Sequence, residues 1–306
     1  MARKKKFDDV NGWLVLDKPV GMTSTQAVAR VKRLMNANKA GHAGTLDPLA
    51  SGLLPIALGE ATKTVSYIMD GRKVYRFAVR WGEQTTTDDT EGEVIATSDH
   101  RPTEDDIVEI LPEFTGEIMQ TPPQFSAIKL QGERAYDLAR AGETVALEAR
   151  PIEVHRLLLI DIEDDGVAVF DCECGKGTYV RALARDMGIR LGTRGHVVSL
   201  RRLLVGPFGE NDMVPVEEIE DLAETGDISA PRSTMLPVDT ALADLPQVTV
   251  NRDMAARLRR GQSIILRGRD APVSEPDVAV FADGELVAIA EAEQGELVPK
   301  RVFNLD

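Results

Sequence analysis

The stretch from Gly41 to Gly52 combines residue types that could do chemistry. It reads Gly41-His42-Ala43-Gly44-Thr45-Leu46-Asp47-Pro48-Leu49-Ala50-Ser51-Gly52. Its three glycines allow the backbone to approach a ligand closely, and Pro48 disfavours helical backbone at Asp47. The pattern indicates a rigid loop that presents one carboxylate, Asp47, and one imidazole, His42. The alternative is an ordinary Asp-Pro turn with a surface histidine. A phosphate-binding loop is disfavoured, because Leu53 follows Gly52 where that motif needs lysine.

A second stretch lies just ahead of a predicted helix and reads Gly175-Lys176-Gly177-Thr178-Tyr179-Val180-Arg181. Two glycines at a helix start could bring backbone N–H groups to a phosphate. Tyr179 offers a ring and a hydroxyl, and Arg181 and Arg185 share one helix face. The alternative is a strand-to-helix turn with a core tyrosine and solvated arginines. The residues alone leave both interpretations open.

Two other groups could suggest a metal. Asp88, Asp89 and Glu91 lack the ligand spacing of a calcium loop, and an acidic hairpin loop is the favoured interpretation. Cys172 and Cys174 are the two cysteines of the chain. With no second pair, a zinc site and a disulfide framework are both disfavoured. We therefore expect no metal.

The charge is unevenly distributed along the chain. The 36 basic and 50 acidic residues give a net charge of −14, which argues against a polyanion as partner. Three segments are nevertheless basic, namely residues 1–80, 176–202 and 250–269. If these segments meet on one face, a polyanion could bind there. Ordinary solvated charge is the alternative.

The size and composition fit one large domain and a small one. The chain has 306 residues, of which 43% are apolar and 28% charged, as is typical of a soluble globular protein. Its apolar runs stay short of the roughly 20 residues of a membrane span. The basic N-terminus has no apolar run behind it and does not resemble a signal peptide. We therefore expect no membrane and a cytoplasmic location.

The elements that must position these residues follow from periodicity. A capping box at Thr23 and Gln26 predicts the start of a helix, and residues 36–52 are expected to form a long loop. Tyr75, Phe77, Val79 and Trp81 alternate with arginines and predict a strand with one wet face. Further strands are predicted at 13–16, 53–58, 151–174 (two, joined by a turn) and 197–205, and further helices at 103–114, 178–191 and 216–223. The mixture predicts an α+β fold.

A boundary is expected near residues 237–247. Beyond it, one short helix (252–260) and strands at 263–266, 278–282, 286–290 and 301–304 suggest a small β-barrel. The predicted domains are therefore 10–240 and 247–306.

Taken together, the two loops resemble the TruB family of pseudouridine synthases. Asp17-Lys18-Pro19 and Gly21-Met22-Thr23-Ser24 also fit, and the similarity is close over residues 12–82 and 121–206. The last 60 residues resemble a PUA domain more loosely. The resemblance implies a mixed, mainly antiparallel sheet with flanking helices in the catalytic domain, and a PUA-like barrel after it. It also implies an RNA-gripping insert at about 123–150, with Lys129 and Arg134.

The resemblance further implies roles for single residues. Asp47 matches the catalytic nucleophile, Arg181 the arginine that pairs with it, and Tyr75 the tyrosine that packs on the target base and moves a proton. Periodicity alone would make Tyr75 a core aromatic. The other matches are to substrate-binding or supporting positions: His42, which helps to displace the target base, Tyr179 and Leu200 in the pocket, and Lys18 with Pro19, which brace it.

The function that the resemblance implies is isomerisation of uridine 55 in the TΨC arm of tRNA, after base flipping, by an enzyme without cofactor or metal. We expect a monomer without an obligate protein partner. A guide-RNA-dependent relative is one alternative, but those usually carry long basic tails. An RNA chaperone or binding module is another, from a different class. An acidic metal hydrolase built on Asp88, Asp89 and Glu91 ranks last.

Overall fold

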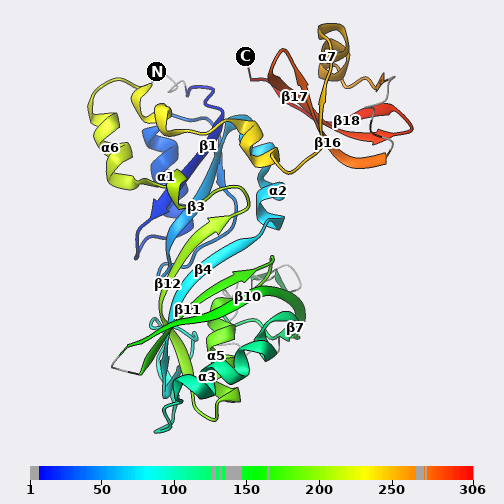
Figure 1. The fold of residues 1–306 in the computed structure, drawn as a ribbon. Helices are drawn as coiled ribbons and strands as arrows, with labels where there is room; N and C mark the ends of the chain where they lie inside the picture. The colour runs from blue at the N-terminus through cyan, green and yellow to red at the C-terminus, as the bar shows by residue number, and fades with distance from the viewer. Residues whose placement is uncertain are drawn as a thin grey trace.

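The computed structural model describes residues 7–125, 147–163, 166–266, 272 and 274–305, and the backbone of 129–130 and 133–134 (Figure 1). The side chains of Lys129 and Arg134, and most of the predicted insert at 123–150, lie outside the described residues. In the described backbone of this segment, two short strands pair, β8 (Lys129–Leu130) and β9 (Glu133–Arg134).

A nine-stranded sheet forms the larger part of the molecule. Strands β1 and β13 run parallel, as do β3 and β12, and the other neighbours are antiparallel. This confirms the predicted mixed, mainly antiparallel sheet. The order is β13 (Val214–Pro215), β1 (Gly12–Lys18), β3 (Ser51–Leu58), β12 (Gly195–Val205), β4 (Lys73–Trp81), β11 (Val167–Cys174), β10 (Arg150–Glu163), β7 (Gly116–Gln120), with β2 (Ala40–His42) added beside β3.

Alternation along β4 explains how the sheet is packed. Phe77, Val79 and Trp81 are buried, whereas Arg76 and Arg80 face solvent. The rings of Phe77 and Phe170 stack with their centroids 5.3 Å apart, on neighbouring strands β4 and β11. One face of the central strands is therefore apolar core and the other is wet, as the alternation predicts.

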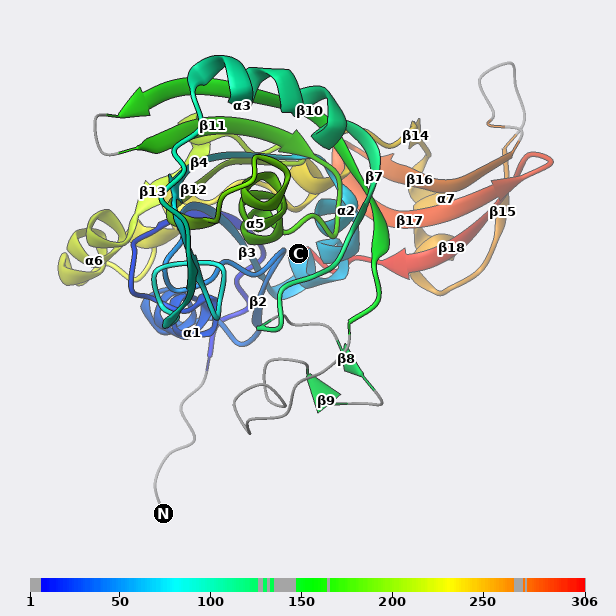
Figure 2. The ribbon, with the colours of Figure 1, turned by 90° about the horizontal axis from the view of Figure 1, so that it is seen from below.

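Helices pack against this sheet (Figure 2). Two of them carry residues that the sequence analysis singled out. Helix α1 (Ser24–Leu34) begins with the predicted capping box at Thr23, and α5 (Val180–Arg190) packs on β12 and β4. Helix α3 (Glu104–Ile110) is shorter than predicted: Pro112 lacks an N–H for a helical bond, and the chain continues as a 3₁₀ turn. The described residues of this part also form the α-helices α2 (Val65–Asp70) and α6 (Val216–Glu224).

The expected long loop at 36–52 is interrupted. Residues Ala40–His42 form β2, and β3 already begins at Ser51. Strand β2 pairs with the outer half of β3, from His42 opposite Ile56 to Ala40 opposite Leu58. The pairing satisfies backbone groups of a segment that sequence periodicity could not identify as a strand.

The last residues form a separate five-stranded sheet. Its order is β14 (Gln247–Thr249), β16 (Ser274–Ala282), β17 (Glu285–Glu293), β18 (Glu296–Val302), β15 (Ile264–Ile265), and α7 (Arg252–Arg259) packs against it. This sheet is compatible with the expected PUA-like domain. The predicted strand at 301–304 was wrong in its bounds, because β18 ends at Val302.

The C-terminal sheet (247–302) is attached to the main sheet by shared contacts. Trp13 and Phe208 belong to the same buried apolar cluster as Ile289 and Phe303. The Lys63 Nζ donates to the Val302 carbonyl at 2.7 Å, and the Asn304 N–H donates to the Glu60 carboxylate at 2.9 Å. Sequence patterns gave no sign of this junction. Among the described residues, no helix is long and apolar enough to cross a membrane.

The parallel pairing of β3 and β12 requires glycine at position 52. Gly52 has φ +93°, and a Cβ there would lie 2.3 Å from the Arg202 carbonyl oxygen. We predict that Gly52→Ala lowers the free energy of unfolding by at least about 1–3 kcal/mol, because it adds backbone strain and a clash. Urea unfolding measures this. Gly41→Ala is the control, since its Cβ would meet nothing within 4 Å, and equal losses in the two variants would contradict the prediction.

Candidate active site

The loop that carries Asp47 is fixed by backbone contacts on both sides. The buried Ser24 hydroxyl donates to the Leu46 carbonyl at 2.9 Å and accepts from the Leu46 N–H at 2.8 Å. The Gly21 N–H donates to the Pro48 carbonyl at 2.8 Å. The Asp47 side chain is 39% exposed. The structure therefore holds the loop rigidly and leaves the carboxylate accessible.

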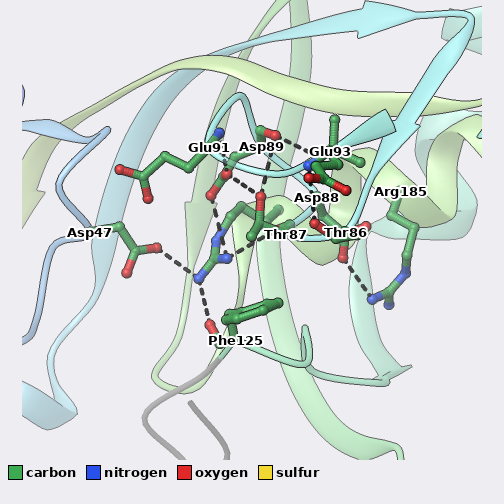
Figure 3. A network of polar contacts seen from close by, with 11 residues as sticks. Asp47, Thr86, Thr87, Asp88, Asp89, Glu91, Glu93, Phe125 and Arg185 are labelled. Atoms are coloured by element: carbon green, nitrogen blue, oxygen red, sulfur yellow. Dashed lines mark hydrogen bonds and ion pairs between the residues drawn. The ribbon is translucent and has the colours of Figure 1, made fainter. Parts of the chain in front are cut away.

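Arg181 joins this carboxylate to a second, buried one (Figure 3). Its Nη2 lies 2.9 Å from Asp47 Oδ2, and its Nη1 lies 3.4 Å from Asp89 Oδ2. The same guanidinium donates to the carbonyls of Thr87 and Phe125, at 2.9 Å each. The Arg181 side chain is only 7% exposed. Its position is therefore determined by four acceptors, and it determines the orientation of Asp47 in turn.

The acidic loop at 86–93 is buried in part, whereas Glu91 and Glu93 are exposed. Asp88 and Asp89 are buried. Asp89 accepts hydrogen bonds from the Thr87 hydroxyl and the Glu91 N–H, and Asp88 pairs with Arg185 at 3.1 Å. The hairpin predicted here exists, between β5 (Glu83–Thr85) and β6 (Val94–Thr97). Within the described part of the chain, no three His, Cys, Asp or Glu side chains gather as a metal site would require.

Negative groups crowd this region, and their pKa values reflect it. Burial raises the pKa of the Asp88 carboxyl, and Arg185 opposes the rise. Burial together with the neighbouring Asp89 and Asp47 carboxylates raises the pKa of Glu91. Arg185 and Arg181 therefore act against these rises but do not cancel them.

Tyr75 and Leu200 lie on neighbouring strands near the loop. Tyr75, on β4, is half-buried and stands opposite Arg202 on β12, whereas the buried Leu200 stands opposite Phe77. Burial raises the pKa of the Tyr75 hydroxyl, and the Arg202 guanidinium opposes the rise. The sheet thus brings a phenol and an aliphatic side chain to the strands that adjoin the Asp47 loop.

Lys18 and His42 lie on the strands next to the loop. The fully buried Lys18 ammonium donates to the carbonyls of Pro19 at 2.9 Å and Met22 at 2.7 Å. Burial lowers its pKa to about 8, although the Asp47 carboxylate acts in the opposite direction. Burial and the Arg202 charge lower the pKa of His42, and its Nδ1 has no hydrogen-bond partner among the described residues.

Tyr179 is the N-cap residue of α5, two positions before Arg181. Its backbone N–H donates to the Gln120 side chain at 2.9 Å, and its carbonyl accepts from the same amide at 3.2 Å. Gln120 is buried at the end of β7. The helix that carries Arg181 is thereby fixed at its first turn.

The structure brings some predicted residues together and adds others. Asp47 and Arg181 are in direct contact, Lys18 is close enough to be influenced by the Asp47 charge, and Tyr75 reaches the loop through Arg202. Sequence reasoning missed three positioning groups: Asp89, Ser24 and Gln120. For Asp89 the only signal was an acid next to a turn, which is also typical of surface loops.

The basic segment at 176–202 is not an open positive patch. Most of its charged side chains bond inside the protein. Arg185, Arg190 and Arg201 pair with carboxylates, and Arg202 donates to backbone carbonyls. Clustering along the sequence therefore overstated the charge that this segment offers to a polyanion.

The Arg181 contacts lead to a prediction about stability. Arg181→Met should lower the free energy of unfolding by about 3–5 kcal/mol, because it leaves the buried Asp89 carboxylate without its cation. Adding Asp89→Asn to that variant should recover part of the loss. Urea unfolding of the two variants measures this. A double variant less stable than Arg181→Met alone would show that Asp89 does not depend on Arg181.

Lys18 leads to a prediction about pH. Its pKa falls from 10.5 to about 8 on folding, so between these values the unfolded chain binds a proton that the folded protein does not. The free energy of unfolding should therefore rise with pH in this window, relative to a Lys18→Met variant. Urea unfolding from about pH 7 to about pH 10 tests this. The control is Lys39→Met at an exposed position; a difference that stays constant or falls contradicts the prediction.

Comparison with known proteins identifies the family. The N-terminal domain of TruB family pseudouridylate synthases matches residues 32–180, the C-terminal domain of tRNA pseudouridylate synthase B matches 181–243, and the C-terminal region of pseudouridine synthase II TruB matches 246–303. Relatives with the name tRNA pseudouridine synthase B include proteins of two bacteria. The protein of Bradyrhizobium diazoefficiens is 64% identical over 97% of this chain and 87% of its own. The protein of Agrobacterium fabrum is 58% identical over 98% of this chain and 97% of its own.

Solved structures agree with this result. A chain in a Cbf5-Nop10-Gar1 complex is similar with a TM-score of 0.73 and 29% identity, over 96% of this chain and 84% of that one. A chain in an H/ACA RNP bound to a substrate RNA containing 2'-deoxyuridine is similar with a TM-score of 0.74 and 25% identity, over 99% of this chain and 92% of that one. Sequence motifs, site geometry and fold lead to one conclusion: this chain belongs to the TruB family of pseudouridine synthases.

Proposed function

We propose that the protein converts uridine to pseudouridine in tRNA, at position 55 of the TΨC arm. The observation that carries the proposal is an accessible Asp47 carboxylate held at 2.9 Å from a nearly buried Arg181, in the loop that matches the family's nucleophile. Relatives at 55–64% identity over nearly the whole chain are named tRNA pseudouridine synthase B, which supports tRNA as the substrate.

The reaction is an isomerisation, and its atoms balance without a co-reactant. The bond between N1 of uracil and C1′ of ribose breaks, the base turns, and a bond forms between C5 and C1′. C5 loses its proton and N1 gains one, so nothing is oxidised and no group leaves. The requirements are a nucleophile, a pocket that retains the free base, and a route for the proton.

The proposed roles follow the geometry. Asp47 is the nucleophile and Arg181 orients it, since the two are in contact. Tyr75 and Leu200 hold the uracil, together with Tyr179. His42 helps to displace the target base from its stack. Unstacking a base costs a few kcal/mol. Lys18 supports the pocket through its bonds to the carbonyls of Pro19 and Met22.

We also propose that the chain acts as a single protomer and without a guide RNA. High identity to tRNA pseudouridine synthase B, against 25–29% to chains of the Cbf5 and H/ACA assemblies, supports this. The division into domains 10–240 and 247–306 stays a proposal, supported by the two separate sheets. The cytoplasm is the proposed compartment, because a bacterial tRNA is found there.

The test uses an unmodified tRNA transcript and the purified chain, with a chelator present. Wild type should form pseudouridine at position 55 and nowhere else, detected as a carbodiimide adduct that stops reverse transcription. Asp47→Asn should form none, because an amide cannot act as the nucleophile, yet it should still bind the transcript.

Asp9→Asn, at an exposed position, is the matched control and should retain full activity. Pseudouridine at other positions would support the proposed isomerisation but contradict position 55 as its target. Binding without product from wild type would instead favour an RNA-binding module or a guide-dependent enzyme. Product from Asp47→Asn would remove Asp47 from the chemistry.

A further inference from the structure

We propose that Arg202 is a positioning residue whose buried guanidinium holds the loop bearing Asp47 in a fixed place beside Tyr75 on the neighbouring strand. The inference rests on the proposed function, because it assigns Arg202 a part in aligning two groups of that site. Neither periodicity nor the resemblance distinguished Arg202 from the other arginines of its segment.

The contacts of Arg202 span the loop on both sides of Asp47. Its Nη2 donates to the Gly44 carbonyl at 3.0 Å and its Nη1 to the Thr45 carbonyl at 3.4 Å, before Asp47. Its Nε donates to the Leu53 carbonyl at 2.7 Å, after Asp47. The residue is 1% exposed. One planar, rigid group thus holds both ends of the loop at a fixed separation.

The same residue adjoins Tyr75. The two residues stand directly opposite each other on the antiparallel strands β12 and β4, so their side chains share a face of the sheet. The Arg202 charge opposes the rise in the pKa of the Tyr75 hydroxyl that burial causes. On β11, the buried Cys172 stands opposite Tyr75 on its other side. Tyr75 is therefore flanked by Arg202 and Cys172 across the sheet, and Arg202 is the residue that also holds the Asp47 loop.

The charge of Arg202 is not compensated locally. Arg181 contacts two carboxylates and Arg201 pairs with Asp17. For Arg202, the residues that the structure describes offer three carbonyl oxygens, and no carboxylate pairs with it. Burial lowers its pKa, and its charge lowers the pKa values of His42 and Lys18. A buried cation without a counter-ion destabilises a fold, so packing alone does not account for arginine here.

Two glycines of the loop adjoin this group. A Cβ at Gly44 would lie 3.3 Å from Arg202 Nη1, and one at Gly52 would meet the Arg202 backbone. The loop therefore passes close to the guanidinium where a side chain would interfere. This gives the glycines of the motif a physical reason besides access for a ligand.

The consequence concerns rate more than binding. Arg202 is buried and does not reach the RNA, so its loss should leave the affinity for tRNA nearly intact. It should instead release Asp47 and Tyr75 from their common support. A displacement of about 1 Å in a catalytic group costs on the order of 100-fold in rate.

The experiment compares Arg202→Met, which removes charge and donors, with Arg202→Lys, which keeps the charge but not the planar set of donors. Arg232→Met is the matched control. Arg232 is half-buried and, like Arg202, bonds a backbone carbonyl, that of Met35; it pairs with Asp8 away from the site. Single-turnover rates at saturating enzyme and the Kd for unmodified tRNA are measured for each. We expect a rate loss of about 100-fold for Arg202→Met, a smaller one for Arg202→Lys, and Kd values within about threefold of wild type.

A second readout separates positioning from general loss of structure. The absorbance of tyrosinate is titrated in wild type and in Arg202→Met, each against the same protein with Tyr75→Phe. Tyr75 should lose its proton at higher pH without the Arg202 charge, whereas Arg232→Met should not change its titration. In rate, Tyr75→Phe should cost less in the Arg202→Met background than in wild type, since the two residues act together.

Each result decides the matter. Equal rate losses in Arg202→Met and Arg232→Met, a Kd that rises in step with the rate loss, or an unchanged Tyr75 titration would overturn the inference. If Arg202→Met does not fold, Arg202→Lys carries the comparison of rate and Kd with Arg232→Met, because it removes the planar set of donors. If wild type forms no pseudouridine, the proposed function fails. The titration then still tests whether Arg202 acts on Tyr75.

Discussion

The pairing of one guanidinium with two carboxylates is the constraint on which the site depends. Arg181 is nearly buried, and it is stable there only because Asp47, Asp89 and two backbone carbonyls surround it. These four acceptors come from the Asp47 loop, the acidic hairpin and the segment after β7. The hairpin, the loop and α5 must therefore all be in place before the carboxylate of Asp47 has a defined direction.

The centre of the sheet supplies the second support. Strand β12 lies between β3 and β4, so it adjoins both the end of the Asp47 loop and the strand that carries Tyr75. Arg202 occupies that position, and Gly52 allows the two strands to approach. The strands β3 and β4 do not pair with each other, and β12, which is far along the chain, lies between them and fixes the relation of loop and phenol.

The same packing determines which charged side chains form bonds within the protein and which are exposed. The protein carries a net charge of −14, and several of its basic residues form bonds within the protein, of which Arg185 and Arg202 are largely buried. On the C-terminal sheet, by contrast, Arg259 and Arg260 near the end of α7 are exposed. That sheet is held against β1 and the turn at 59–63 by an apolar cluster and two hydrogen bonds. Its exposed arginines therefore have a defined place relative to the site.

The sequence by itself determined the long strands of the main sheet, most helices of the described residues, the mixed fold and the two loops of the site. Alternation along β4 and the capping box at Thr23 are local, and local patterns depend on neighbours within a few residues. It did not determine β2, the burial of Asp88 and Asp89, the junction with the C-terminal sheet, or the contacts of Arg202. Each of these depends on a partner far along the chain, such as Arg181 for Asp89 and Gly44 for Arg202. The local sequence pattern around an acid or an arginine is the same whether its side chain is solvated or is buried beside an opposite charge. Only the tertiary structure decides between these two environments.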